Sequence, residues 1–295
     1  MSVPIAVLAG YLGSGKTTLL NRLLASEDDL SGLAVLVNDF GSVNVDAEHI
    51  RGRAPDANVL ALTNGCVCCS VQGDLAGTLE SLRTRDVQRI WLEASGVALP
   101  GKLRQQCAYP GFHAHGVWVT VDARHHGARL DDAYVGDLAQ RQVVEADVLL
   151  ITKTDAVSKA AATAVRQRLA PAHKPVHDSA AFQLVEVWQG NAVRAETTAV
   201  APAVPFVSAT LPLAGPVSAD ALVRYLTALP PGIARVKGFA TTGQGSVSVN
   251  VVAGSPPQLM PYLGVAPQAL VFVAPAEAEA ALSAAVAEAA SALGP

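Results

Sequence analysis

A glycine-rich run near the N-terminus has the spacing needed to hold phosphate groups. It reads Gly10-Tyr11-Leu12-Gly13-Ser14-Gly15-Lys16-Thr17, fits the pattern G-x-x-x-x-G-K-[ST], and stands between an apolar run and a helical pattern. Glycines at these positions let the backbone curl, so that successive N–H groups point at phosphate oxygens. The backbone contacts are expected from Gly10, Gly13, Ser14 and Gly15.

The side chains that follow are expected to complete a nucleotide site. Lys16 brings a cation to the β and γ phosphates, and the hydroxyl of Thr17 is a ligand for Mg²⁺. Thr18 is a weaker candidate for a phosphate contact. The run therefore predicts binding of a nucleoside triphosphate with Mg²⁺.

An acidic residue at the end of a neighbouring strand is needed to hold Mg²⁺ beside such a loop. The run Trp91-Leu92-Glu93-Ala94-Ser95-Gly96 supplies Glu93 as the first candidate. Gly96 follows at the spacing of the Asp-x-x-Gly of many GTPases, in which the Gly amide contacts the γ-phosphate. The alternative is an ordinary exposed Glu at the end of a strand.

Nucleotide choice depends on Thr152-Lys153-Thr154-Asp155, which follows an apolar run as an N-K-x-D box would. A carboxylate at Asp155 can accept from both N1–H and the exocyclic amine of guanine, and adenine offers neither donor there. The stem of Lys153 is expected to pack over the base, and Thr152 replaces the usual Asn while keeping a hydroxyl. These residues favour GTP, with a plain surface turn as the alternative.

Three of the four cysteines lie within four residues, as Cys66, Cys68 and Cys69. Thiolates at this density suit Zn²⁺, Co²⁺ or a related cation, and three of them leave one position of a tetrahedral site open. An open position fits a metal carrier better than a structural zinc site. A redox pair or buried small side chains are the alternatives.

Composition excludes several other classes of protein. The 295 residues are 51% hydrophobic and 16% charged, which excludes whole-chain disorder. With 21 Lys and Arg against 25 Asp and Glu, and no basic block, nucleic-acid binding is disfavoured. The uncharged stretch at residues 197–219 contains four prolines, so it is not expected to span a membrane. The N-terminus shows no signal peptide, and we expect a cytoplasmic protein.

Apolar runs rich in Val, Ile and Leu alternate with longer helical patterns, which predicts an α/β fold with a mostly parallel sheet flanked by helices. Strands are expected at residues 3–8, 33–37, 58–62, 89–92, 116–121, 148–151 and 175–176. Helices are expected after Gly15 and over residues 73–85, 138–145 and 159–169.

The periodic pattern is lost around residues 190–205. We therefore expect a first domain over residues 1–195, a linker rich in Pro and Ala over 196–204, and a smaller α+β domain over 205–295. The second domain is expected to contain strands at 205–209, 234–241, 246–252 and 269–273, and helices at 218–229 and 276–292.

Together these motifs resemble the CobW-like family of P-loop GTPases, which are metal-trafficking proteins and metallochaperones. The resemblance covers most of the chain. Residues 37–41 read V-N-D-F-G in place of the family's V-N-E-F-G, and residues 235–238 resemble the R-x-K-G of its C-terminal domain. The most specific feature is the C-x-C-C motif between a P-loop and an E-x-x-G.

The resemblance implies a P-loop NTPase G domain that binds MgGTP and holds Zn²⁺ or Co²⁺ at the C-x-C-C motif. Hydrolysis to GDP and phosphate would change metal affinity, and the partner would be a client metalloprotein or metal-requiring enzyme. Asp39, one methylene shorter than the family's Glu, is an additional candidate ligand. His113, His115 and His125 are further candidates, whereas Cys107 is expected to be buried. A homodimer is compatible with the sequence.

Two other functions fit parts of the pattern. A small-molecule or nucleotide kinase would use the same glycine-rich loop with structural cysteines, although it has no need for residues 152–155. A non-catalytic metal store or sensor would bind nucleotide only to stabilise its fold.

Overall fold

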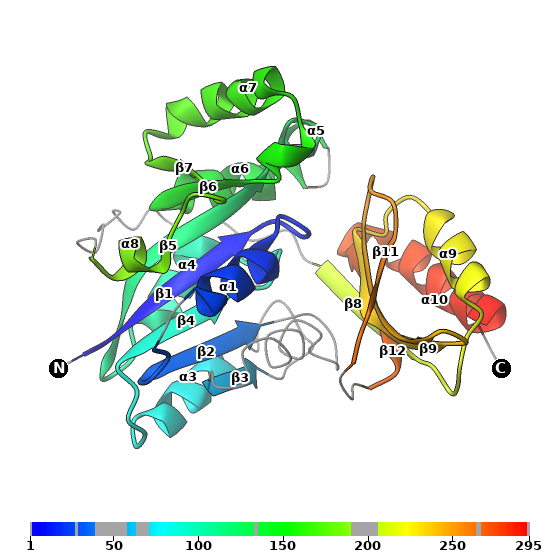
Figure 1. Ribbon diagram of the computed structural model, residues 1–295, viewed down its shortest axis with the longest axis horizontal. Helices are drawn as coiled ribbons and strands as arrows, with labels where there is room; N and C mark the ends of the chain where they lie inside the picture. The colour runs from blue at the N-terminus through cyan, green and yellow to red at the C-terminus, as the bar shows by residue number, and fades with distance from the viewer. Residues whose placement is uncertain are drawn as a thin grey trace. The chain divides into compact units, whose positions relative to one another are not determined.

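The computed structural model describes residues 2–26, 29–38, 58–62, 71–132, 135–189, 206–263 and 267–293. The chain divides into two compact units (Figure 1). The described part of the first is residues 2–26, 29–38, 58–62, 72–132 and 135–189, and that of the second is mainly residues 206–263 and 267–293. The expected linker, residues 196–204, lies outside the described residues.

The first unit contains a seven-stranded sheet in the order β3-β2-β4-β1-β5-β6-β7, in which all the paired neighbours are parallel. Its central strands are buried apolar runs, as expected of a parallel sheet covered on both faces. The strands are β1 (Val3–Gly10), β2 (Leu33–Asn38), β3 (Asn58–Leu62), β4 (Arg89–Glu93), β5 (Phe112–Asp122), β6 (Val148–Thr152) and β7 (Val176–Asp178).

Helices lie on both faces of this sheet: Figure 1 shows α1 in front of it, with α4 and α6 behind. Their apolar faces, such as Leu75, Leu79 and Leu82 of α3, pack into one core with the strands. The helices are α1 (Lys16–Ala25), α3 (Val71–Leu82), α4 (Pro100–Cys107), α5 (His126–Leu130), α6 (Gly136–Glu145), α7 (Lys159–Leu169) and α8 (Leu184–Gln189).

The second unit contains a five-stranded sheet in the order β11-β10-β9-β12-β8, with antiparallel neighbours. Leu222 and Leu226 of α9 and Leu282 of α10 join the apolar core of the unit. The α9 helix begins after Ser218, whose hydroxyl accepts a hydrogen bond from the Ala221 N–H. The elements are β8 (Phe206–Pro212), α9 (Ala219–Thr227), β9 (Arg235–Thr242), β10 (Gly245–Val252), β11 (Gln258–Pro261), β12 (Ala269–Pro275) and α10 (Glu279–Leu293).

The glycine of the R-x-K-G sequence, Gly238, is required by the packing of the second sheet. Gly238 pairs with Leu270 and Val249 in the middle of the sheet. A Cβ at Gly238 would lie 1.9 Å from the carbonyl oxygen of Ala269, so only glycine allows this approach of the strands.

The expected α/β class is confirmed, as is the mostly parallel sheet flanked by helices. The structure adds α4, α5, α8 and β11, which were not expected, and β5 starts at Phe112 rather than at Gly116. Among the described residues, no helix combines the length and the apolar character needed to cross a bilayer.

Candidate functional site

The order of the parallel strands brings the ends of four strands that carry candidate residues to one edge of the first sheet. β1 lies between β4 and β5, and β6 is the next strand after β5. Because parallel strands all end at the same edge, the strand ends Gly10, Glu93, Asp122 and Thr152 meet there. This carboxyl edge is where ligands bind in open parallel sheets.

The phosphate loop, residues 10–17, connects β1 to α1 through a tight turn. Gly10, Gly13 and Gly15 have φ values of 133°, 70° and 92°, which favour glycine. At Gly10 space also requires glycine, since a Cβ would lie 2.5 Å from the carbonyl oxygen of Thr120. The Ser14 and Thr120 hydroxyls share a hydrogen bond of 2.6 Å, which fixes the loop to β5.

Lys16 begins α1 and is only 4% exposed. Its Nζ donates to the carbonyl oxygen of Gly10 at 2.9 Å and to that of Tyr11 at 3.3 Å. The ammonium is therefore held across the phosphate loop, where it adds positive charge to the N-terminus of a helix.

Thr17 and Glu93 form a close polar pair at the same edge. The Thr17 hydroxyl donates to Oε1 of Glu93 at 2.6 Å, and Glu93 is 1% exposed at the end of β4. Gly96 lies against the phosphate loop, because a Cβ there would be 2.7 Å from the backbone nitrogen of Leu12. The two predicted elements, residues 10–17 and 93–96, are thus in direct contact.

The end of β6 reaches the phosphate loop from the other side. The Thr152 hydroxyl donates to the carbonyl oxygen of Ser14 at 2.7 Å. Lys153, with φ of 58°, donates from Nζ to the carbonyl oxygen of Gly13 at 2.5 Å. Asp155 is exposed in the short turn Thr154–Ala156 that follows. The hydroxyl at Thr152 therefore supports the loop in place of the usual Asn.

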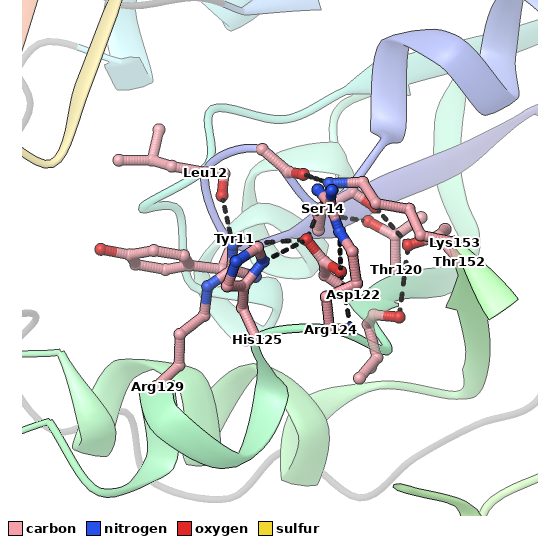
Figure 2. A network of polar contacts seen from close by, with 12 residues as sticks. Tyr11, Leu12, Ser14, Thr120, Asp122, Arg124, His125, Arg129, Thr152 and Lys153 are labelled. Carbon is pink, nitrogen blue, oxygen red and sulfur yellow. Dashed lines mark hydrogen bonds and ion pairs between the residues drawn. The ribbon is translucent and has the colours of Figure 1, made fainter. Parts of the chain in front are cut away.

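Asp122, at the end of β5, joins several cationic groups (Figure 2). Its Oδ2 lies 2.7 Å from Nζ of Lys153 and 3.1 Å from Nδ1 of His125, and its Oδ1 accepts from the Arg124 N–H at 3.0 Å. Burial raises the pKa of Asp122, but these donors outweigh burial and lower the pKa to about 2. Asp122 is therefore a carboxylate at neutral pH.

Arg129 of α5 contacts the phosphate loop from outside (Figure 2). Its guanidinium donates to the carbonyl oxygen of Leu12 at 3.2 Å and lies over the Tyr11 ring, 4.9 Å from the ring centre. Burial raises the pKa of Tyr11 to about 12, so the phenol stays neutral. Asp122, Arg129 and Thr120 were not predicted. The signal for Asp122 was present, since Val121-Asp122 ends an apolar run as Leu92-Glu93 does.

The candidate histidines have separate surroundings. His113 shares a hydrogen bond with the Ser2 hydroxyl at 3.0 Å, and Nε2 of His115 lies 2.7 Å from the carbonyl oxygen of Val187. His115 also stacks on two tryptophans, whereas His125 lies beside Asp122. A ligand role for these three residues stays a prediction.

Cys107 is fully buried, and burial raises the pKa of its thiol to about 12. Its burial is as expected from the sequence. The predicted transition-metal ligands Cys66, Cys68, Cys69 and Asp39 lie outside the described residues. Within the described ranges, no group of three or more His, Cys, Asp and Glu side chains is arranged to hold a metal ion.

Comparison with known proteins finds a matching family model and similar proteins for the first unit. Residues 4–178 match the family model described as CobW/HypB/UreG, nucleotide-binding domain. The zinc chaperone YjiA of Escherichia coli K12 is 36% identical over 187 residues, which cover 59% of this chain and 57% of that protein. The zinc-regulated GTPase metalloprotein activator 1 of Schizosaccharomyces pombe is 31% identical over 178 residues, which cover 57% of this chain and 43% of that protein.

A crystal structure of Zn(II)-bound YjiA GTPase from E. coli covers 98% of this chain and 99% of its own, with a TM-score of 0.47 and 22% identity. By sequence, the chain spans about half the length of the curated relatives it matches. The family model covers more than half of the chain and includes the phosphate loop, Glu93 and residues 152–155. The chain therefore belongs to the CobW/HypB/UreG family through its nucleotide-binding domain.

Proposed function

We propose that this chain is a GTP-hydrolysing metallochaperone that binds MgGTP at the phosphate loop and Zn²⁺ or Co²⁺ at Cys66, Cys68 and Cys69. The observation that carries this proposal is the convergence on one sheet edge of Lys16, the Thr17–Glu93 pair and residues 152–155. Relatives named zinc chaperone and zinc-regulated GTPase metalloprotein activator support it.

In this proposal the chain's own residues divide the work of binding MgGTP. Lys16 neutralises charge on the β and γ phosphates. Thr17 and Glu93 hold Mg²⁺, and their oxygens fit, since Mg²⁺ prefers hydroxyl, carboxylate and water ligands. Gly96 contributes its amide to the γ-phosphate, and Asp155 accepts from the guanine edge. The contacts of Thr17 with Glu93 and of Gly96 with Leu12 support these roles.

The metal in this proposal is cargo that is passed to a client. The thiolates of the C-x-C-C motif suit Zn²⁺ and Co²⁺, and their open fourth position suits release. Asp39 is an additional ligand candidate. The client is a metalloprotein or a metal-requiring enzyme, the protein works in the cytoplasm, and self-association into a homodimer is compatible with it.

Nucleotide choice is tested by thermal unfolding with MgGTP and with MgATP. A ligand at about 100 times its dissociation constant adds roughly 2.7 kcal/mol to the free energy of unfolding. GTP should raise the melting temperature at concentrations where ATP does not. Stabilisation by ATP and not by GTP would instead favour the alternative function, a small-molecule or nucleotide kinase. The variant Asp155→Ala should remove the preference for GTP, because the carboxylate that distinguishes guanine is lost.

Coupling is tested by titrating Zn²⁺ and Co²⁺ into the GTP-bound and the GDP-bound protein. By linkage, GTP must strengthen metal binding by the same factor as the metal strengthens GTP binding. Identical metal affinities in the two states would contradict the chaperone mechanism and favour a metal store. The variant with Cys66, Cys68 and Cys69 changed to Ser should lose the metal. Its control is Cys107→Ala, which removes a buried thiol and should leave the metal stoichiometry unchanged.

A further inference from the structure

We propose that Arg129 is a positioning residue of the phosphate loop, which holds the Leu12–Gly13 peptide so that the Gly13 N–H faces the bound phosphates. This inference rests on the proposed nucleotide site. It adds a residue that lies outside the sequence motifs of that site.

The first argument concerns the carbonyl groups of the loop. Three consecutive carbonyl oxygens each accept from a different side chain: Leu12 from Arg129, Gly13 from Lys153 and Ser14 from Thr152. In a trans peptide the C=O and the following N–H point in opposite directions. A side chain that fixes a carbonyl therefore also fixes the direction of the next amide. Arg129 does this for Gly13, a residue whose φ of 70° lets the chain turn there.

The second argument concerns how firmly Arg129 itself is held. Its side chain is 11% exposed, and its guanidinium contacts the Leu12 carbonyl and the Tyr11 ring and lies 3.7 Å from Oδ2 of Asp122. A planar guanidinium can stack on a ring and donate at its edge at the same time, which an ammonium cannot do. Arg129 is thus a fixed donor for the loop.

The third argument is the connection that Asp122 makes. The same Oδ2 atom lies 2.7 Å from Nζ of Lys153 and 3.7 Å from the guanidinium of Arg129. Lys153 donates to the carbonyl oxygen of Gly13 and Arg129 to that of Leu12, so both cations contact the phosphate loop (Figure 2). Asp122 therefore links the two cations that hold neighbouring carbonyl groups of the loop, and the buried carboxylate balances charge that both bring there.

This arrangement predicts an effect on binding rather than on the chemical step. Arg129 touches the loop and not the reacting atoms, so its loss should weaken the complex with GTP and the transition state alike. In that case KM rises and kcat changes little. A residue that only stabilised the fold would behave differently. Its loss would lower the fraction of active protein, and hence the apparent kcat, without changing KM.

The experiment compares Arg129→Met with Arg129→Lys and with the control Arg83→Met. Arg83 is exposed and pairs with Glu80 on the surface at 3.0 Å. Dissociation constants for GTP and GDP are measured by calorimetry, kcat and KM by phosphate release, and folding by thermal unfolding. Arg129→Met should raise the GTP dissociation constant and KM by about tenfold, with kcat within about threefold of the wild-type value. Arg129→Lys should be intermediate, and Arg83→Met unchanged.

An unchanged KM in Arg129→Met, in a protein whose wild type binds GTP, would overturn this inference and leave the proposed function standing. If Arg129→Met does not fold, Arg129→Lys decides by the same criterion, because it keeps a cation beside Asp122. A wild type that binds no nucleoside triphosphate would instead overturn the proposed function itself.

Discussion

Two buried aspartates show how the two edges of the parallel sheet differ. Asp122 and Asp147 are each 1% exposed, and each lies within hydrogen-bonding distance of a cationic side chain. Asp147 precedes β6 at the amino edge, where Oδ2 accepts from the Val117 N–H and from Arg104, both at 2.7 Å. Asp122 ends β5 at the carboxyl edge, beside the phosphate loop.

The difference lies in what surrounds the two carboxylates. Asp147 satisfies one backbone amide and one arginine, and so joins β5 to α4. Asp122 lies beside Lys153 and Arg129, and both of these donate to carbonyl groups of a loop that has amides to offer a ligand. The same pairing of Asp with a cation thus joins a strand to a helix at one edge. At the other edge it positions the side chains that contact the phosphate loop.

The largest expected effect separates the chemistry of the carboxyl edge from the fold. Lys16→Ala removes the cation held across the phosphate loop and should lower kcat for GTP hydrolysis by about 10²- to 10³-fold. The nucleotide-free protein should remain folded. Steady-state phosphate release and thermal unfolding measure the two effects. Hydrolysis at the wild-type rate would show that Lys16 does not contact the phosphates, and metal handling that is unchanged by its loss would favour a metal store or sensor.

The next prediction tests the comparison between Asp147 and Asp122. Asp147→Ala leaves the Val117 amide and Arg104 without their acceptor, and should lower the free energy of unfolding by about 3 to 4 kcal/mol. The GTP dissociation constant of the folded variant should not change. Asp122→Ala should lower stability and also weaken GTP binding. Chemical denaturation and calorimetry on both variants provide the measurement. If both weaken GTP binding equally, the two edges do not differ as described.

Much of the fold follows from local sequence, and the exceptions have physical causes. Buried parallel strands such as β2 are unbroken apolar runs, which is why their positions were predicted. The helix α4 buries only Pro100, Leu103 and Cys107, too few for a clear period. The start of β5 was missed because His113 and His115 interrupt its apolar pattern. The edge strand β11 is largely exposed and ends at Pro261.

The residues of the candidate site also fall into those that local sequence predicts and those that it does not. Residues 10–17 and 152–155 were predicted because their spacing is local and specific. Arg129 contacts Leu12, which is 117 positions away in the sequence, and Thr120 contacts Ser14, which is 106 positions away. Such contacts depend on the order β1-β5-β6 in the sheet, which the sequence does not state. Motifs therefore identified the groups expected to touch the nucleotide, and the structure was needed to find those that hold them.

A smaller effect uses pH to test His126, the first residue of α5. Burial, with Arg129 and Arg168 nearby, lowers the pKa of His126 from 6.5 to about 4. Between these two values the unfolded chain binds a proton that the folded protein does not. The contribution of His126 to the free energy of unfolding is therefore fully present above pH 6.5, and it falls by up to about 3 kcal/mol as the pH approaches 4. His126→Asn should flatten this part of the curve of unfolding free energy against pH.

The matched control for His126 is His173→Asn. His173 is exposed, and its φ of 52° is one that Asn tolerates. This variant should keep the wild-type slope between pH 4 and 6.5. An equal slope in His126→Asn and the wild type would show that the loss of stability in acid arises elsewhere in the protein.

The smallest expected effect separates residues near the carboxyl edge from residues that hold the site. Ser158 lies three positions after Asp155, and its hydroxyl accepts from the Ala161 N–H at 3.2 Å to begin α7. Ser158→Ala should lower the free energy of unfolding by about 1 kcal/mol, because one helix amide loses its partner. GTP affinity should stay the same, since no contact of the phosphate loop is removed. Ser158→Ala could instead weaken GTP binding as much as Arg129→Met. That result would mean that any loss of a contact near the expected guanine site weakens binding, and that the contacts to the loop carbonyls have no special role.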